Sequence, residues 1–205
     1  SINPANAMTI SAWIKITDVT GFNAIVSRWS TTPPFSYFFN LNSGNSRLQF
    51  YVLSNIFEIS DDSLSLNVWH HVVVIFDGSI QTITFYVNGS VIPSTTSGTI
   101  PATIPSSTNK TSIGGDIERN NFFFQGNIDE VSIWKKTLNQ AEVTELFNNG
   151  KPGNLSVHIA VADLVGWWRM GDDDDIITLI KDRSINNNNG IPINMEAGDI
   201  VPDVA

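Results

Sequence analysis

The segment MTISAWIKI, residues 8–16, alternates between apolar and polar side chains along its length. Successive side chains of an extended strand point to opposite faces, so every second residue lies on the same side. One face then carries only apolar side chains: Met8, Ile10, Ala12, Ile14 and Ile16. The other positions, Thr9, Ser11, Trp13 and Lys15, fall on the second face. This period of two predicts a β-strand with one side buried in a core.

Similar short runs follow at regular spacing and are separated by turn residues. They are NAIVSRW (23–29), FSYFFNL (35–41), SRLQFYVL (46–53), VWHHVVVIF (68–76) and QTITFYVN (81–88). The dipeptide Asn88-Gly89 is the strongest hairpin signal, because both residues tolerate the positive φ of a tight two-residue turn. Residues 93–112 are rich in Pro, Ser and Thr and predict a long surface connection. Many short strands predict an all-β fold, an antiparallel sandwich or barrel.

One short helix is predicted near residues 140–148. Asn139 can cap its first turn, Glu142 stands three positions later as in a capping box, and Gly150 follows its end. The remaining chain, 151–205, is expected to contribute a strand, LVGWWRM (164–170), and an acidic, Asn-rich loop. Strand patterns resume on both sides of every connection, so we interpret residues 1–205 as a single domain.

Composition excludes several classes of function. The formal net charge is -9, and an acidic chain has no electrostatic attraction for phosphate backbones or anionic membranes. No apolar run approaches the roughly 18 residues of a membrane span, and no targeting signal is recognisable. There is no cysteine, which excludes disulfides and thiolate metal sites. The sequence therefore predicts neither nucleic-acid binding nor membrane insertion, and it has the character of a processed or excerpted segment.

The order of several pieces resembles a known family. MTISAWIKI, NVWHHVVVIFDG, TFYVNG and FQGNIDEVSIW, taken together, resemble the laminin G-like and pentraxin-like domains of the concanavalin A-like lectin superfamily. The likeness runs from about Met8 to Gly150, and it is closest to domains of phage structural and bacterial surface proteins. It implies an antiparallel jelly-roll β-sandwich, usually with binding on a concave face or at the rim of loops.

The stretch GWWRMGDDDDIITLIKDRSINNNNG, residues 166–190, also fits this resemblance. It is similar to the strand, acidic loop and Asn- and Gly-rich motif with which members of the superfamily commonly begin. Here that unit stands at the C-terminal end. The strand is expected to pair within its own chain, and exchange with a neighbouring copy is the alternative.

Calcium is the cofactor that the resemblance suggests. Asp116 and Glu118 match positions that carry ligands in the pentraxin acidic loop, and Asn42 and Asn45 match a loop that supplies an Asp-Asn pair. The aspartate of that pair is missing here, and an ordinary polar rim is the alternative. Four consecutive aspartates, with Asp172 and Asp174 on one side, are a weaker candidate for oxygen ligation. A solvated loop is the alternative for them.

Aromatic rings among polar residues are the candidates for ligand binding. Trp13 lies on the polar face of its strand, and Tyr51 shares a face with Arg47 and Gln49. Such rings can stack on a sugar, although the 93–112 connection could cover either of them. Trp167 and Trp168 point to opposite faces, so at most one of them can reach a ligand.

No enzyme pattern is present in the sequence. Asp129 and Glu130 are neighbours, so their side chains are predicted to point to opposite faces and cannot act as the acid and nucleophile of a glycosidase. We expect Asp129 to bond backbone donors and Glu130 to be solvated. His70 and His71 likewise point apart and lack the spacing of a zinc motif.

These observations predict a non-catalytic, lectin-like binding or adhesion module for a glycan or surface polysaccharide, outside the cell or on a virion. The first alternative is a structural building block, such as a virion decoration, fibre or array subunit. Its partners would be other copies or other structural proteins of the same assembly. An inactive relative of a glycosidase is a further alternative.

Overall fold

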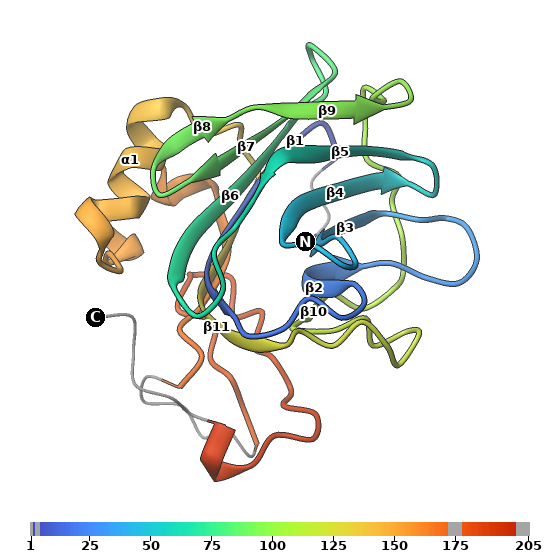
Figure 1. Cartoon of the computed structure of the whole chain (residues 1–205). Helices are drawn as coiled ribbons and strands as arrows, with labels where there is room; N and C mark the ends of the chain where they lie inside the picture. The colour runs from blue at the N-terminus through green and yellow to red at the C-terminus, as the bar shows by residue number, and fades with distance from the viewer. Residues whose placement is uncertain (1, 3–4, 172–177, 200–205) are drawn as a thin grey trace.

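The protein is a sandwich of two antiparallel sheets (Figure 1). The computed structural model describes residues 2, 5–171 and 178–199. The first sheet, called sheet A, contains in spatial order β12 (Leu164–Trp168), β11 (Gly126–Trp134), β1 (Ala7–Ile16), β6 (Trp69–Asp77), β7 (Thr82–Val87) and β8 (Ser90–Ile92). Sheet B contains β10 (Ser112–Ile113), β2 (Asn23–Arg28), β3 (Tyr37–Leu41), β4 (Arg47–Leu53), β5 (Ile56–Ser63) and β9 (Ser94–Ser97). The predicted all-β sandwich is confirmed.

The core between the sheets follows the alternation seen in the sequence. All five apolar residues of the first face of β1 are buried there, as expected from the period of two. Val72, Val74 and Phe76 of β6 pair beside them and point to the same side. From sheet B, the core receives Tyr37, Phe39, Leu41, Leu48, Phe50 and Val52.

The predicted helix is present as α1 (Gln140–Phe147). The Asn139 side chain accepts hydrogen bonds from two backbone amides, and the Glu142 carboxylate accepts one from the Asn139 amide. This is the predicted capping box, which satisfies otherwise unpaired donors of the first turn. Short 3-10 helices follow at Asn148–Gly150, Leu155–Val157, Val161–Asp163 and Ala197–Asp199. Within the described residues, no helix combines the length and the apolar character needed to cross a membrane.

The connection 93–112 is more structured than predicted. Its first part forms β9, which pairs with β5 at the edge of sheet B, and its last residue begins β10. The strand β5 itself has no counterpart among the predicted runs. The hairpin at Asn88-Gly89 is confirmed, because it joins β7 to β8 with φ values of 50° and 78°.

The outer face of sheet A is covered. Val143 and Leu146 of α1, together with Leu155 and Ala160 of the following segment, pack on Val73 and Ile75 of β6 and on Trp134 and Trp167. Figure 1 shows α1 beside the β7–β8 hairpin, on the side of sheet A that faces away from sheet B. The polar face of β1 is therefore buried as well.

The C-terminal segment closes the edge of sheet A. Strand β12 pairs with β11 of its own chain, and the loop that follows folds back on β12. The Asp182 carboxylate accepts hydrogen bonds from the backbone amides of Trp167, Ser184 and Asn188. Both tryptophans are buried: Trp168 lies in the core between the sheets and Trp167 lies beneath the helical layer. Neither is free for a ligand.

Strand β11 contains a β-bulge opposite Ala12. The register shifts between Ser11, which pairs with Ser132, and Trp13, which pairs with Asp129. Glu130 lies in this bulge with a φ of 50°. A bulge turns a side chain away from the simple alternation of a strand. The expectation that Glu130 is solvated is therefore wrong: the side chain is buried and accepts hydrogen bonds from Trp167 Nε1 and Arg169 Nε at 2.6 and 2.8 Å.

Candidate functional site

The outer face of sheet B is the open face of the sandwich. Sheet A is covered by α1 and the segment after it. Within the described residues, no helix packs on the outer side of β2, β3, β4 and β5, and the β10–β11 loop and the β2–β3 connection border that side. Of the side chains that point outward from these strands, Arg47, Tyr51 and Phe57 are partly exposed, whereas Ser27, Asn40 and Gln49 are buried.

A row of aromatic rings crosses this face. Phe57 of β5, Tyr51 of β4, Phe38 of β3 and Phe122 of the bordering loop form it, and we call it the aromatic strip. The ring centroids are 4.7 Å apart for Phe57 and Tyr51, 6.2 Å for Tyr51 and Phe38, and 5.8 Å for Phe38 and Phe122. Phe38 is buried beneath its neighbours, whereas the other three rings are half-buried. Half-buried rings offer a flat apolar surface to solvent.

Two further rings support the strip from the side. Trp29 lies 5.9 Å from Tyr51 and 6.1 Å from Phe38, and it stacks on Phe35 at 5.0 Å. Trp29 is buried, so it fixes the position of Tyr51 and Phe38 and does not itself meet solvent. Partial burial also raises the pKa of the Tyr51 hydroxyl, although a hydrogen bond with Gln49 opposes this, and Tyr51 stays neutral at physiological pH.

Phe122 has an unusual backbone for a bulky residue. Its φ is 59°, in the left-handed region that costs a residue with a Cβ about 1–2 kcal/mol. Its carbonyl oxygen accepts a hydrogen bond from the Ala24 amide, and its ring packs on Ala24 and Phe38. The Arg119 guanidinium lies over the same ring, 5.5 Å from its centroid. The loop thus holds this ring at the end of the strip despite the backbone cost.

Three polar side chains beside the strip each have one unpaired oxygen atom. Ser27 Oγ, Asn40 Oδ1 and Gln49 Oε1 are buried and make no hydrogen bond within the described residues. They come from three adjacent strands, and Asn40 and Gln49 are opposite each other in the register of β3 and β4. Most buried polar atoms in proteins have a partner, and one left unpaired costs about 1–3 kcal/mol. We call these three side chains the polar row.

The positive charges bordering this face are already engaged. The Nε of Arg47 donates to the Ser60 carbonyl, and its guanidinium lies 3.8 Å from the Asp61 carboxylate. Arg119 donates to the Ser30 carbonyl and lies 3.5 Å from the Asp116 carboxylate. The face is therefore aromatic and polar. Each of the two guanidinium groups described at its border, those of Arg47 and Arg119, has a carboxylate within 4 Å.

The predicted ligand-binding residues separate into two places. Tyr51 and Arg47 both lie on the outer face of β4, as expected. Trp13 lies in sheet A and is 4% exposed, because the rings of Phe147 and His71 pack on it at 5.9 and 5.2 Å. The structure does not present Trp13 to a ligand. Its cover is α1, and not the 93–112 connection that the sequence had suggested.

The predicted calcium ligands do not converge in this structure. Asp116 is buried and paired with Arg119, while the Glu118 carboxylate accepts a hydrogen bond from the Lys110 amide. Burial raises the pKa of Asp116 above its ordinary value, although Arg119 lowers it.

The second predicted loop, with Asn42 and Asn45, is anchored elsewhere. The Gly44 amide donates to the Val19 carbonyl, and Asn45 Oδ1 accepts from the Arg47 amide. Among the described residues, no three carboxylate or histidine side chains are grouped for a metal. Asp172 and Asp174 lie outside the described residues.

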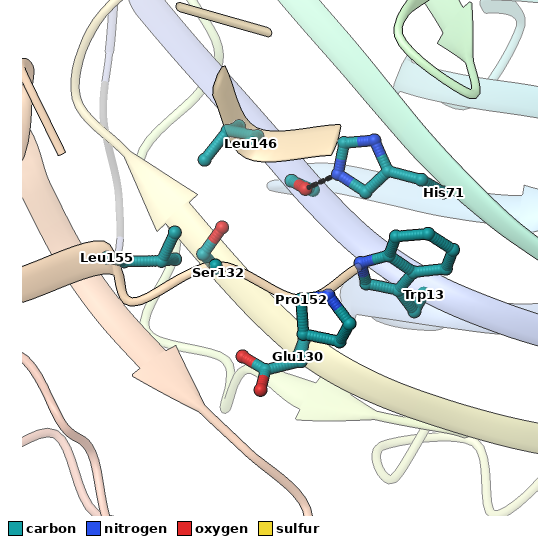
Figure 2. Close-up of a pocket in the computed structure, with 9 residues that line it drawn as sticks. Trp13, His71, Glu130, Ser132, Leu146, Pro152 and Leu155 are labelled. Carbon is teal, nitrogen blue, oxygen red and sulfur yellow. Dashed lines mark hydrogen bonds between the residues drawn. The ribbon is translucent and has the colours of Figure 1, made fainter. Parts of the chain in front are cut away.

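A small cavity lies beneath Pro152, between sheet A and the helical layer (Figure 2). Its volume is about 10 Å³, enough for about one water molecule. His71 borders it, 1% exposed, and its Nε2 is 2.8 Å from Ser11 Oγ. Burial lowers the pKa of His71 to about 3, so the ring is neutral. Glu130 also borders the cavity and is bonded to Trp167 and Arg169. These groups belong to the packing of the fold and have no access for a substrate.

A wider cleft of about 990 Å³ lies at the edge between the sheets. Its walls are mainly apolar and come from the β10–β11 connection and the C-terminal segment, including Ile113, Phe124, Met170 and Ile180. These side chains pack against the core between the sheets. Its lining also includes Phe123, which is 50% exposed, and the Nε of Arg28, which makes no hydrogen bond within the described residues.

A family match accounts for this architecture. The sequence model described as the concanavalin A-like lectin/glucanases superfamily, of the laminin G type, matches residues 1–144. None of the curated proteins compared with the chain matches it.

Several solved structures share the fold. A candidate carbohydrate-binding protein of Bacteroides ovatus has a TM-score of 0.71 and 16% identity, with 91% of this chain and 51% of that protein covered. The chain thus spans about half the length of that protein. The CBM40 of Ruminococcus gnavus IT-sialidase, bound to α2,3-sialyllactose, has a TM-score of 0.58 and 13% identity, covering 71% and 84%. A heptameric pentraxin of Limulus polyphemus has a TM-score of 0.53 and 18% identity, covering 70% and 71%. At these identities the similarity establishes the fold alone.

Proposed function

Because the chain belongs to the concanavalin A-like lectin/glucanases superfamily, we propose that it is a non-catalytic module that binds a glycan on the outer face of sheet B. The aromatic strip is the observation that carries the proposal. Sugar rings have apolar C–H faces that pack on aromatic rings, and hydroxyl groups at their edges that bond amides and carbonyls. The strip and the polar row supply both kinds of contact side by side.

The carboxylates near β11 support a binding role over hydrolysis. Glycoside hydrolysis needs two carboxyl groups that flank the scissile bond. Glu130 is buried and occupied by Trp167 and Arg169, and the Asp129 carboxylate accepts a hydrogen bond from the Glu130 amide. Both lie in sheet A, in the sheet opposite to the aromatic strip. One structural neighbour is described as a candidate carbohydrate-binding protein, and another is bound to α2,3-sialyllactose.

This role places the module where glycans are displayed, at the surface of a cell or a virion. The direct measurement is binding of the fluorescently labelled chain to intact cells, before and after enzymatic removal of surface polysaccharide. Loss of binding after removal supports the placement, and equal binding before and after contradicts it.

The proposal is tested by removing single rings from the strip. Tyr51→Ala and Phe57→Ala should each weaken binding to a glycan array by about tenfold, since one stacked ring contributes about 1–1.5 kcal/mol. Phe123→Ala is the matched control, because Phe123 is half exposed but lies outside the strip. Circular dichroism and thermal melting check that each variant folds. Retained binding in both strip variants would place the site elsewhere.

A further inference from the structure

The polar row and the charges around it restrict the kind of glycan that fits. Asn40 Oδ1 and Gln49 Oε1 are hydrogen-bond acceptors, and Ser27 Oγ can accept or donate. An unpaired acceptor gains most from a ligand group that donates, such as a sugar hydroxyl or the N–H of an acetamido group. A carboxylate, sulfate or phosphate group only accepts, so it gains nothing from the two amide oxygens.

The positive charges that an anionic sugar requires are not free. A buried carboxylate on a ligand is stable only when a cation or several donors compensate its lost hydration. Arg47 and Arg119 are the guanidinium groups at the border of the face, and each has a carboxylate and a carbonyl as partners. An anionic ligand would have to compete with the carboxylates for these charges, and the net charge of -9 repels it at longer range.

The length of the strip gives a second restriction. It extends from β5, across β4 and β3, to the loop beside β2. Neighbouring strands are about 4.8 Å apart, so three strand spacings make a strip of roughly 15 Å. That length exceeds one sugar ring and suits several consecutive units of a chain lying across the strands.

From these observations we propose that the outer face of sheet B selects an uncharged oligosaccharide chain, whose rings pack along the aromatic strip and whose hydroxyl or acetamido groups donate to Asn40 and Gln49. This inference rests on the proposed glycan-binding function. It also separates this chain from the structural neighbour bound to α2,3-sialyllactose, a trisaccharide that ends in an anionic sialic acid. Both oxygens are buried in this structure, so the side chains that cover them must move for the donors to reach them.

The test uses the full chain in isothermal titration calorimetry. One set of ligands is neutral oligomers of glucose, xylose, arabinose and N-acetylglucosamine of increasing length, and the other is sialyllactose and galacturonate oligomers. The expected result is binding within the neutral set that tightens with length and is unchanged between low and high ionic strength. Binding of the anionic ligands alone, or binding that is lost at high ionic strength, overturns the selectivity for uncharged chains. Either result leaves the proposed glycan binding intact. No binding in either set overturns the proposed function together with this inference.

Gln49→Leu tests the polar row separately. It removes the unpaired oxygen and the hydrogen bond with Tyr51 but keeps the volume, so the melting temperature should change little while affinity for the neutral oligomer falls about three- to tenfold. Gain or retention of stability with loss of binding is the signature of a group kept for a ligand. Gln140→Leu, on α1 at the far side of the sandwich, is the control and should not change affinity. Unchanged affinity in Gln49→Leu overturns the role of the row.

Discussion

Acidification from pH 7 to pH 5 should destabilise the fold through His71. His71 lies beside Trp13 (Figure 2) and also packs against Phe147. Burial lowers its pKa from 6.5 to about 3, so the folded ring stays neutral across this range. In the unfolded chain the same ring takes up a proton below pH 6.5. The unfolded state therefore binds more protons, and stability must fall as the pH falls.

The size of the effect follows from the two pKa values. The contribution of His71 to the free energy of unfolding is fully present above pH 6.5 and declines as the pH falls toward 3. Each pH unit within that window corresponds to about 1.4 kcal/mol, and pH 5 lies about 1.5 units below the unfolded value. The free energy of unfolding should thus fall by about 2 kcal/mol between pH 7 and pH 5 from His71 alone.

Urea denaturation at both pH values, for the native chain and for His71→Phe, measures this contribution. Phenylalanine keeps a ring against Trp13 and Phe147 but cannot titrate. The variant should lose about 2 kcal/mol less stability on acidification, because all other titrating groups cancel in the comparison. Should the variant not fold, an NMR titration of the His71 ring in the native chain gives the same answer. An identical pH dependence in both proteins, or a ring that titrates near pH 6.5, would refute the reasoning.

Four further predictions follow from other parts of the structure. Gly126→Ala should destabilise the fold by about 3 kcal/mol, because its Cβ would lie 2.0 Å from the Lys15 carbonyl oxygen. The control Gly44→Ala meets no atom within 4 Å and should cost about 1 kcal/mol, as measured in thermal melts. Reducing-sugar assays on polysaccharides should stay at background, and turnover lost in Glu130→Gln would contradict this. Calcium binding at Asp116 stays a prediction. Millimolar Ca²⁺ should raise the melting temperature, and Asp116→Asn should abolish that rise. If the melting temperature does not change with Ca²⁺, the role of Asp116 is its ion pair with Arg119. Truncation after Gly150 should give an aggregating product, because β11 loses its partner β12; a stable, soluble fragment would show that β12 is dispensable.

Local patterns predicted most of the fold. The alternation of β1, the capping box at Asn139 and the turn at Asn88-Gly89 each depend on neighbouring residues, and each is present as expected. Strand β5 escaped prediction because its second half, Ser60 to Ser63, is polar and carries no hydrophobic alternation.

The candidate site was only partly predictable, because its features arise from distant parts of the chain. Trp13 has the same polar neighbours as a ligand-binding ring, but α1, more than a hundred residues later, covers it. The bulge at Glu130 depends on its pairing with β1, which a strand pattern does not contain. Tyr51 was recognisable from its own strand, whereas Phe122 joins it through a loop with a positive φ that an aromatic residue gives no reason to expect.

The layered order of helix, sheet A and sheet B determines how the module can be mounted. With α1 on one side and the aromatic strip on the other, a tether fixed at the exposed Glu145 of α1 directs the strip away from its support. Copies mounted in this way on a surface would all face outward, and a long polysaccharide could run across several of them. Each added contact is then intramolecular, with an effective concentration in the millimolar range for short spacings. In this arrangement, several weak sites together would bind the polysaccharide tightly, while each single copy would still dissociate from it quickly.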